Sequence, residues 1–193
     1  MVKRAMALLS SRHGNVQGLA LDAFQEQAMG ALATQLPPDG SRLLLSSYAL
    51  QWSPAPLEVL QRVWALFARS GDWLALAVPD ASSFALLRAA LAAANLPSHL
   101  LPLPEHQALI GPRAQRALAP WWRWVAGGVF VNAVPVGSAV EYLRHFTLIG
   151  ARPERSRYAP RDVVRLRRCL EGEMRRSSAQ LDYHSTWMLL QRI

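Results

Sequence analysis

An alternation of strand-like and helix-like segments is the feature that most restricts how this sequence can fold. Residues 43–50 begin with three leucines and are apolar on both faces, which is typical of a strand buried inside a parallel sheet. Apolar residues at helical spacing follow over 57–67, and residues 73–78 form a second strand-like run. This order predicts an α/β fold with residues 43–50 in the middle of the sheet.

The remaining segments continue the alternation and bring the expected sheet to about five strands. Further strands are expected over 15–21, 128–136 and 183–190, and helices over 24–35, 84–94, 140–148 and after Pro160. Two polar pairs have the spacing of capping boxes at helix starts, namely Asp22 with Gln25 and Ser138 with Glu141. In the helix after Pro160 we expect the apolar residues to face inward and the arginines outward, the inward set being Val163, Val164, Leu166 and Leu170.

A stretch rich in proline and tryptophan interrupts the pattern. Residues 97–120 contain five prolines, and Trp121, Trp122 and Trp124 follow them. We interpret residues 97–127 as a small cap or insertion within a single domain spanning residues 1–193. Its tryptophans are expected to pack within that subdomain, with stacking on a ligand as the alternative.

The charge balance favours acidic partners. Lys and Arg number 21 against 13 Asp and Glu, giving a net charge of +8, and Lys3 is the sole lysine. Arginine favours bidentate contacts to carboxylates and phosphates. A single cysteine, Cys169, excludes an internal disulfide framework and indicates the cytoplasm. No apolar run reaches the roughly 18 residues of a membrane span, and the scattered histidines predict no metal site.

Four segments in order carry a resemblance to a known family. They are SSYALQW at 46–52, DWLALAVPD at 72–80, SAVEYLRHFTLIGA at 138–151, and a last strand that opens with Tyr183 and His184. Together, roughly over 41–193, they resemble class I S-adenosylmethionine-dependent methyltransferases, most closely the malonyl-acyl-carrier-protein O-methyltransferases of biotin synthesis. The resemblance implies a truncated Rossmann-like sheet with helices on both faces, and methylation of a malonyl carboxylate by S-adenosylmethionine.

The resemblance also assigns candidate site residues. It implies cofactor binding by Asp22, Ser46, Ser47 and Tyr48, substrate binding by Gln51 and Trp52, and an arginine-rich rim for an acidic acyl carrier protein made of Arg144, Arg152, Arg155, Arg157 and Arg161. Alternatives stay open: Asp22 as a ribose ligand, an adenine neighbour or a helix cap, the aromatic residues as packing, and the arginines as a solvated face. No catalytic acid or base is expected, because the accepting carboxylate is already ionised.

The family's glycine-rich GxGxG turn is absent from this chain. In the family, the strand that carries this turn lies beside the strand corresponding to residues 43–50, so its loss leaves a sheet edge without hydrogen-bond partners. Three explanations remain open. Residues 15–21 take that place, a second subunit or dimer partner covers the edge, or the sequence is the C-terminal part of a longer reading frame with Met1 an internal methionine.

Three functions are therefore compatible with the sequence. The first is an O-methyltransferase acting on carrier-bound malonate, and the second is a noncatalytic or fragmentary partner protein of the same fold. The third is a basic nucleic-acid-binding module, which a sequence pI of about 10.9 favours but no stacking motif supports.

Overall fold

The computed structural model describes residues 22–36, 39–100, 102–148 and 158–193. The described elements are, in chain order, α2 (Glu26–Ala33), β1 (Leu43–Ser47), η1 (Leu50–Trp52), α3 (Pro56–Glu58), η2 (Val59–Trp64), α4 (Ala65–Phe67), β2 (Trp73–Pro79), α5 (Ala85–Ala93), α6 (His106–Ile110), α7 (Pro112–Leu118), β3 (Trp122–Pro135), α8 (Ala139–Leu148), α9 (Pro160–Arg176) and β4 (Gln180–Arg192). No helix among them has both the length and the hydropathy to cross a bilayer.

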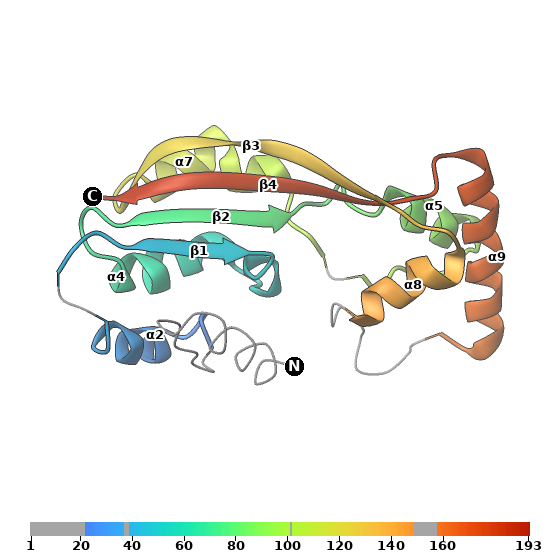
Figure 1. The fold of residues 1–193 in the computed structure, drawn as a ribbon, viewed down its shortest axis with the longest axis horizontal. Helices are drawn as coiled ribbons and strands as arrows, with labels where there is room; N and C mark the ends of the chain where they lie inside the picture. Colours follow the sequence, from blue (N-terminus) through green and yellow to red (C-terminus); the bar gives the residue numbers. More distant parts are fainter. Residues whose placement is uncertain (1–21, 37–38, 101, 149–157) are drawn as a thin grey trace.

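The strands form one open, mixed sheet, which confirms the predicted α/β class. The order is β1-β2-β4-β3, with β1 parallel to β2 and β4 antiparallel to both of its neighbours (Figure 1). The described part of the chain has four strands where about five were expected. The expected strand at 15–21 lies outside the described residues.

β1 lies at the edge of this sheet, so the prediction that residues 43–50 occupy its middle is wrong. Leu43 is 59% exposed and Leu45 is 74% exposed. A strand that is apolar on both faces is typical of the centre of a sheet, but position depends on the neighbours available. No described strand pairs with the outer side of β1.

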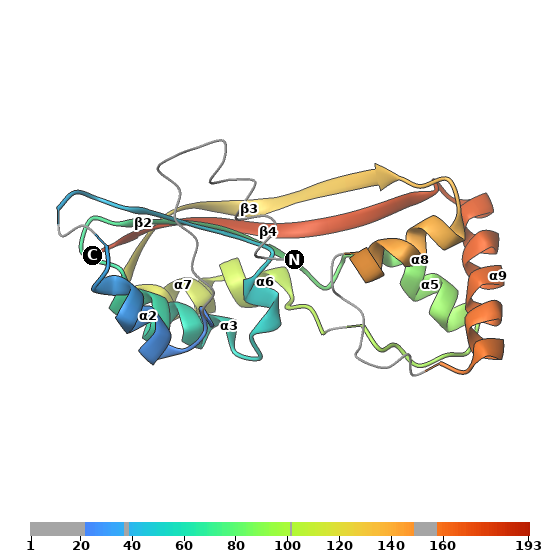
Figure 2. The ribbon, with the colours of Figure 1, turned by 60° about the horizontal axis from the view of Figure 1, so that its bottom comes forward.

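Helices cover one face of β1 and β2. Figure 2 shows α2, α3, α6 and α7 together beneath the sheet. They bury a core that includes Leu60, Leu74, Leu109, Leu118 and Leu190. The crossover from β1 to β2 is one continuous helical stretch, which begins with Pro56 at its first position, where a proline costs no hydrogen bond.

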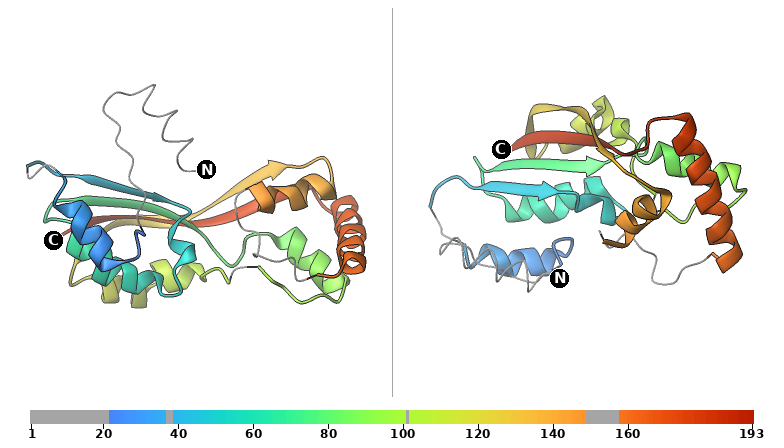
Figure 3. Two further views of the ribbon diagram at one scale, coloured as in Figure 1. Left: turned by 90° about the horizontal axis from the view of Figure 1, so that it is seen from below. Right: turned by 45° about the vertical axis from the view of Figure 1, so that its right-hand side comes forward.

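The antiparallel pair of β3 and β4 extends beyond this core to a second cluster of helices (Figure 3). There α5, α8 and α9 pack around a separate core that includes Leu87, Tyr142, Leu166, Leu170 and Leu181. Burial of Leu166 and Leu170 confirms the inward face predicted for α9. Val163 and Val164 are exposed, contrary to prediction. Val163 lies in the first turn of α9, and Val164 points roughly opposite Leu166.

The proline- and tryptophan-rich stretch is part of the layered structure. Residues 97–127 contain α6, α7 and the beginning of β3, which starts six residues before the expected strand. Trp122 is buried in the core, where its indole N–H donates to the Leu60 carbonyl oxygen at 2.9 Å. The division of the chain into a domain and a cap stays a prediction.

Candidate functional site

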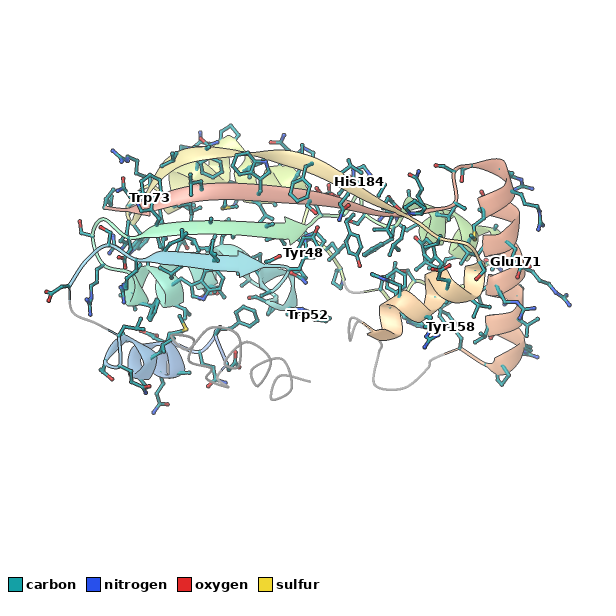
Figure 4. The ribbon with its side chains drawn as sticks, viewed as in Figure 1. Tyr48, Trp52, Trp73, Tyr158, Glu171 and His184 are labelled. Atoms are coloured by element: carbon teal, nitrogen blue, oxygen red, sulfur yellow. The ribbon has the colours of Figure 1, made fainter. Side chains whose placement is uncertain are left out.

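The candidate site lies where the parallel strands β1 and β2 end. Ligands of open α/β sheets bind at the carboxyl ends of parallel strands, because the loops that leave them converge there. The loop after β1 carries Tyr48 and Trp52, and the loop after β2 begins at Asp80. β4 runs past both loops, since its Ser185 pairs with Pro79 of β2 (Figure 4).

Tyr48 is held in a strained conformation at the centre of this region. Its φ of 52° is left-handed, a conformation that a bulky residue adopts only when its surroundings enforce it. The Tyr48 amide donates to the Ala77 carbonyl oxygen at 2.9 Å, and its hydroxyl lies 2.6 Å from Ser185 Oγ. Its ring stacks on Tyr183 with a centroid distance of 5.5 Å. β2 and β4 together therefore fix the direction of the Tyr48 side chain.

Tyr183 extends this cluster to α8. Its hydroxyl is hydrogen-bonded to Nε2 of His145, and its ring meets Phe84 edge-on at 5.0 Å. Burial, with a smaller contribution from Tyr48, raises the pKa of Tyr183 to about 12. Burial lowers the pKa of His145. Both directions favour the uncharged forms, so the cluster offers neutral donors and acceptors at neutral pH.

The loop after β2 is held by its own hydrogen bonds. Asp80 is buried, and its carboxylate accepts from the Ser82 amide at 2.8 Å and from Thr186 Oγ1 at 3.3 Å. Ser83 Oγ donates to the His184 carbonyl oxygen and accepts from the His184 amide. These polar groups are engaged in fixing the loop to β4, which suits a supporting role.

Two buried oxygen atoms near Tyr48 have no hydrogen-bond partner among the described residues. One is Oε1 of Gln51, whose Nε2 donates to the Tyr48 carbonyl oxygen at 2.6 Å, and the other is Ser46 Oγ. Unpaired buried acceptors are costly, so native structures rarely keep them without a reason. Trp52, which was predicted with Gln51, is 46% exposed at the rim of the same loop (Figure 4).

A groove of about 600 Å³ runs along the outer edge of β1. Ser46 and Ser47 line it from the strand, and Ala23, Met29 and Leu32 line it from α2 and the turn before it. The structure therefore brings three of the predicted cofactor residues to one place, with both serines in the groove and Tyr48 directly after them.

The carboxylate of Asp22, the fourth predicted cofactor residue, is hydrogen-bonded to residues close to it in sequence. Its exposed carboxylate accepts from the Phe24 amide at 3.0 Å and from Gln25 Nε2 at 3.0 Å. α2 starts only at Glu26. Asp22 thus stabilises the turn that precedes the helix, a use closest to the capping alternative. At the other predicted cap, the Glu141 amide donates to Ser138 Oγ, which confirms that helix start.

The predicted arginine rim is only partly described. Arg144 is exposed on α8, next to His145 in sequence, and Arg161 is exposed in the first turn of α9. Arg152, Arg155 and Arg157 lie outside the described residues. The structure therefore places one predicted arginine on the helix that contacts Tyr183 and another on the outermost helix.

Sequence reasoning missed Ser185, Tyr183 and His145 as members of the site. The sequence marks Tyr183 only as the start of a strand, and His145 is one of several scattered histidines. The alternation along β4 held a usable signal, because Tyr183 and Ser185 are two residues apart and must share one face of a strand.

The residues of this chain fit only one side of an S-adenosylmethionine site. Ser46, which lines a groove of about 600 Å³, and Gln51, in the loop after β1, each have a buried oxygen without a partner among the described residues. The sequence has no glycine-rich turn through which a backbone could approach the cofactor closely, and the Asp22 carboxylate is engaged in its own turn. The described residues therefore do not form a complete site for this cofactor.

Comparison with known proteins gives distant structural likeness and no sequence match. No protein-family model and no curated protein matches the chain. A Bacillus halodurans C-125 protein, provisionally assigned as a methyltransferase, is 12% identical with a TM-score of 0.49, covering 98% of this chain and 78% of that one. The [4+2]-cyclase SpnF is 12% identical with a TM-score of 0.45, covering 98% and 62%. The MccD protein is 12% identical with a TM-score of 0.35, covering 88% and 78%.

Proposed function

We propose that this chain is a methyltransferase-type protein that supplies the substrate-facing half of a site for methylating a malonyl carboxylate on acyl carrier protein. The observation that carries the proposal is the strained Tyr48 turn at the end of β1, which Ser185 and Tyr183 hold in place. Strain of this kind persists where the surroundings over-determine it, and it gathers at ligand-binding sites.

The chemistry of the cluster suits a carboxylate that accepts a methyl group. Such an oxygen is already nucleophilic, so positioning and exclusion of water supply most of the rate. The hydroxyls of Tyr48 and Ser185 can orient an acyl group through neutral hydrogen bonds. Exposed Trp52 adds an apolar surface at the rim.

The basic character of the chain supports an acidic carrier as the bearer of the substrate. Arg144 follows Leu143 and precedes His145 on α8, the helix that reaches Tyr183. A positively charged rim raises the encounter rate with an acidic partner. Biotin synthesis in the cytoplasm follows from the sequence resemblance and belongs to this proposal.

The cofactor half of the site is assigned to a second polypeptide or to a segment beyond the described residues. The outer edge of β1, which pairs with no described strand, and the missing glycine-rich turn support this part of the proposal. The same observations favour a second candidate, a noncatalytic partner protein that has kept the fold. The two differ in whether the chain distinguishes malonyl-loaded carrier protein from unloaded carrier.

Calorimetric titration of the purified chain tests the proposal. We expect tighter binding of malonyl-loaded than of unloaded acyl carrier protein, and we expect Tyr48→Phe to reduce that difference. Tyr158→Phe is the matched control, because the Tyr158 hydroxyl donates to the Pro97 carbonyl oxygen, away from β1. Equal affinity for both carriers would favour the noncatalytic partner. Micromolar binding of S-adenosylmethionine by the chain alone would contradict the proposal that this chain supplies only the substrate-facing half of the site.

A further inference from the structure

Helix α9 carries more arginines than its own carboxylates can neutralise. Its 17 residues include six arginines and three acidic residues. Each acidic residue pairs with an arginine on the same helix, in the pairs Asp162–Arg165, Glu171–Arg167 and Glu173–Arg176. Within the described residues, Arg161, Arg168 and Arg175 have no carboxylate at ion-pair distance.

These three arginines form one line along the helix, which we name the α9 ridge. They are seven residues apart, so each lies two turns beyond the last, about 10 Å further along the axis and only about 20° around it. Leu166 and Leu170, which are buried against the second core, lie on the opposite side of α9. The α9 ridge is therefore the outermost line of the helix, and all three arginines are exposed.

The surface beside the α9 ridge allows another helix to approach closely. Val164 is 44% exposed on the same side. Gly172 lies between Arg168 and Arg175, and a Cβ placed there would meet nothing within 4 Å. A partner helix can therefore contact an apolar side chain and the bare backbone between the cations.

We propose that the α9 ridge docks an acidic helix of a partner protein through carboxylates that repeat every two turns. Resting on the function proposed above, the partner is the acidic carrier protein, and the α9 ridge is its docking surface. An arginine fork matches a carboxylate with two parallel hydrogen bonds, and the seven-residue repeat of α9 matches the same repeat on a partner helix.

Two other readings of this basic helix fit less well. Nucleic acid would bring phosphates close to Glu171 and Glu173, and α9 contains no aromatic side chain on which a base could stack. An ordinary solvated face would show no division between paired and unpaired arginines along one line. Here the carboxylates neutralise the arginines that flank the α9 ridge, and no carboxylate of the described residues pairs with the three arginines of the line itself.

The test compares two triple variants that remove the same charge from the same helix. One is R161Q/R168Q/R175Q on the α9 ridge, and the matched control is R165Q/R167Q/R176Q at the paired positions. The probe is unloaded acyl carrier protein, titrated calorimetrically at low and high salt, with circular dichroism to check folding. At low salt we expect the ridge variant to bind the carrier about tenfold more weakly than the parent chain does. At high salt we expect this difference to disappear, because the charges of the parent chain are screened.

Three outcomes would overturn the α9 ridge as a docking surface. Equal losses in both variants would mean that net charge alone steers the carrier, and no loss in the ridge variant would remove its role. Loss of mixed-sequence DNA binding with unchanged carrier binding would assign it to nucleic acid. The proposed function fails separately, because it depends on the difference between malonyl-loaded and unloaded carrier, which the ridge variant leaves in place.

Discussion

The hydroxyl oxygen of Tyr48 lies 2.6 Å from Oγ of Ser185, which joins the loop after β1 to the middle of β4. The two residues are 137 positions apart in sequence. Ser185 is fully buried, so water cannot replace the hydrogen bond that its hydroxyl forms with Tyr48. The contact holds the left-handed Tyr48 residue in place and fixes the geometry of the candidate site.

Removing the Tyr48 hydroxyl should destabilise the protein without dismantling the aromatic cluster. Tyr48→Phe keeps the ring that stacks on Tyr183 but leaves the Ser185 hydroxyl unpaired. We expect a loss of about 1 kcal/mol in the free energy of unfolding, measured by urea titration. Ser185→Ala and the double variant complete the cycle, and strictly additive losses would show that the two hydroxyls are not coupled.

The pair of Arg42 and Asp72 ties the start of β1 to the turn before β2. Asp72 is fully buried and accepts from Arg42 Nε at 2.8 Å, from the Arg42 amide at 2.8 Å and from the Arg69 amide at 2.8 Å. Asp72→Asn leaves the Arg42 guanidinium without its counter-charge. We expect a loss of about 3 kcal/mol in the free energy of unfolding, because an uncompensated buried charge is costly.

The same pair predicts a defined loss of stability in acid. Burial alone would raise the pKa of Asp72, but hydrogen bonds from the Arg42 side chain and from the Arg69 and Arg42 amides outweigh it and lower the pKa. The contribution is complete above the ordinary carboxyl value of about 3.9 and disappears as pH falls through the lower folded value. Unfolding followed by circular dichroism at a series of acidic pH values should show that stability depends less steeply on pH in Asp72→Asn than in the parent chain. An unchanged dependence would contradict Asp72 as its source.

Local sequence patterns predicted where the helices and strands lie in the sequence better than they predicted which elements lie side by side in the fold. The strand-like apolar run at residues 73–78 predicted β2 to within a residue, and the Ser138–Glu141 spacing predicted the start of α8. Both features depend only on residues close in sequence. The place of β1 in the sheet depends on which other strands are present, which its leucines do not encode.

The sequence likewise predicted only those residues of the candidate site that lie close together in the chain. Ser46, Ser47 and Tyr48 were predicted from the resemblance carried by residues 46–52, and the structure places them at the carboxyl end of β1, where ligands of open sheets bind. Ser185 and His145 come from segments far along the chain, and only the pairing of β4 with β2 brings Ser185 to the end of β2. Their role follows from register and from the packing of α8, which no local pattern specifies.

His145 should make stability depend on pH near neutrality. Its imidazole is half-buried and bonded to the Tyr183 hydroxyl, and burial lowers its pKa. The unfolded chain therefore takes up a proton before the folded protein does, so stability is complete above about pH 6.5 and falls as the pH drops toward the folded pKa. His145→Gln keeps a hydrogen-bonding group without a titrating one. Urea titrations between pH 8 and 5 should show a weaker dependence in the variant, whereas parallel curves would exclude His145 as the source.

The outer edge of β1, along which no described strand lies, predicts opposite effects for two neighbouring leucines. The Trp73 amide donates to the Arg42 carbonyl oxygen and the Tyr48 amide donates to the Ala77 carbonyl oxygen, so even-numbered residues of β1 direct their backbone toward β2. Leu45 therefore directs its amide and carbonyl away from the sheet, and its side chain is 74% exposed. Leu44 instead packs against the first core.

An unpaired apolar edge is a template for association with another chain, and a lysine blocks it. Leu45→Lys should therefore reduce self-association, measured by light scattering over a range of protein concentrations, with a change in unfolding free energy of about 0.5 kcal/mol or less. Leu44→Lys places the same charge in the core and should unfold the protein. If Leu45→Lys unfolded the chain as Leu44→Lys does, the outer side of β1 would have to be covered, and the free edge would not exist in solution.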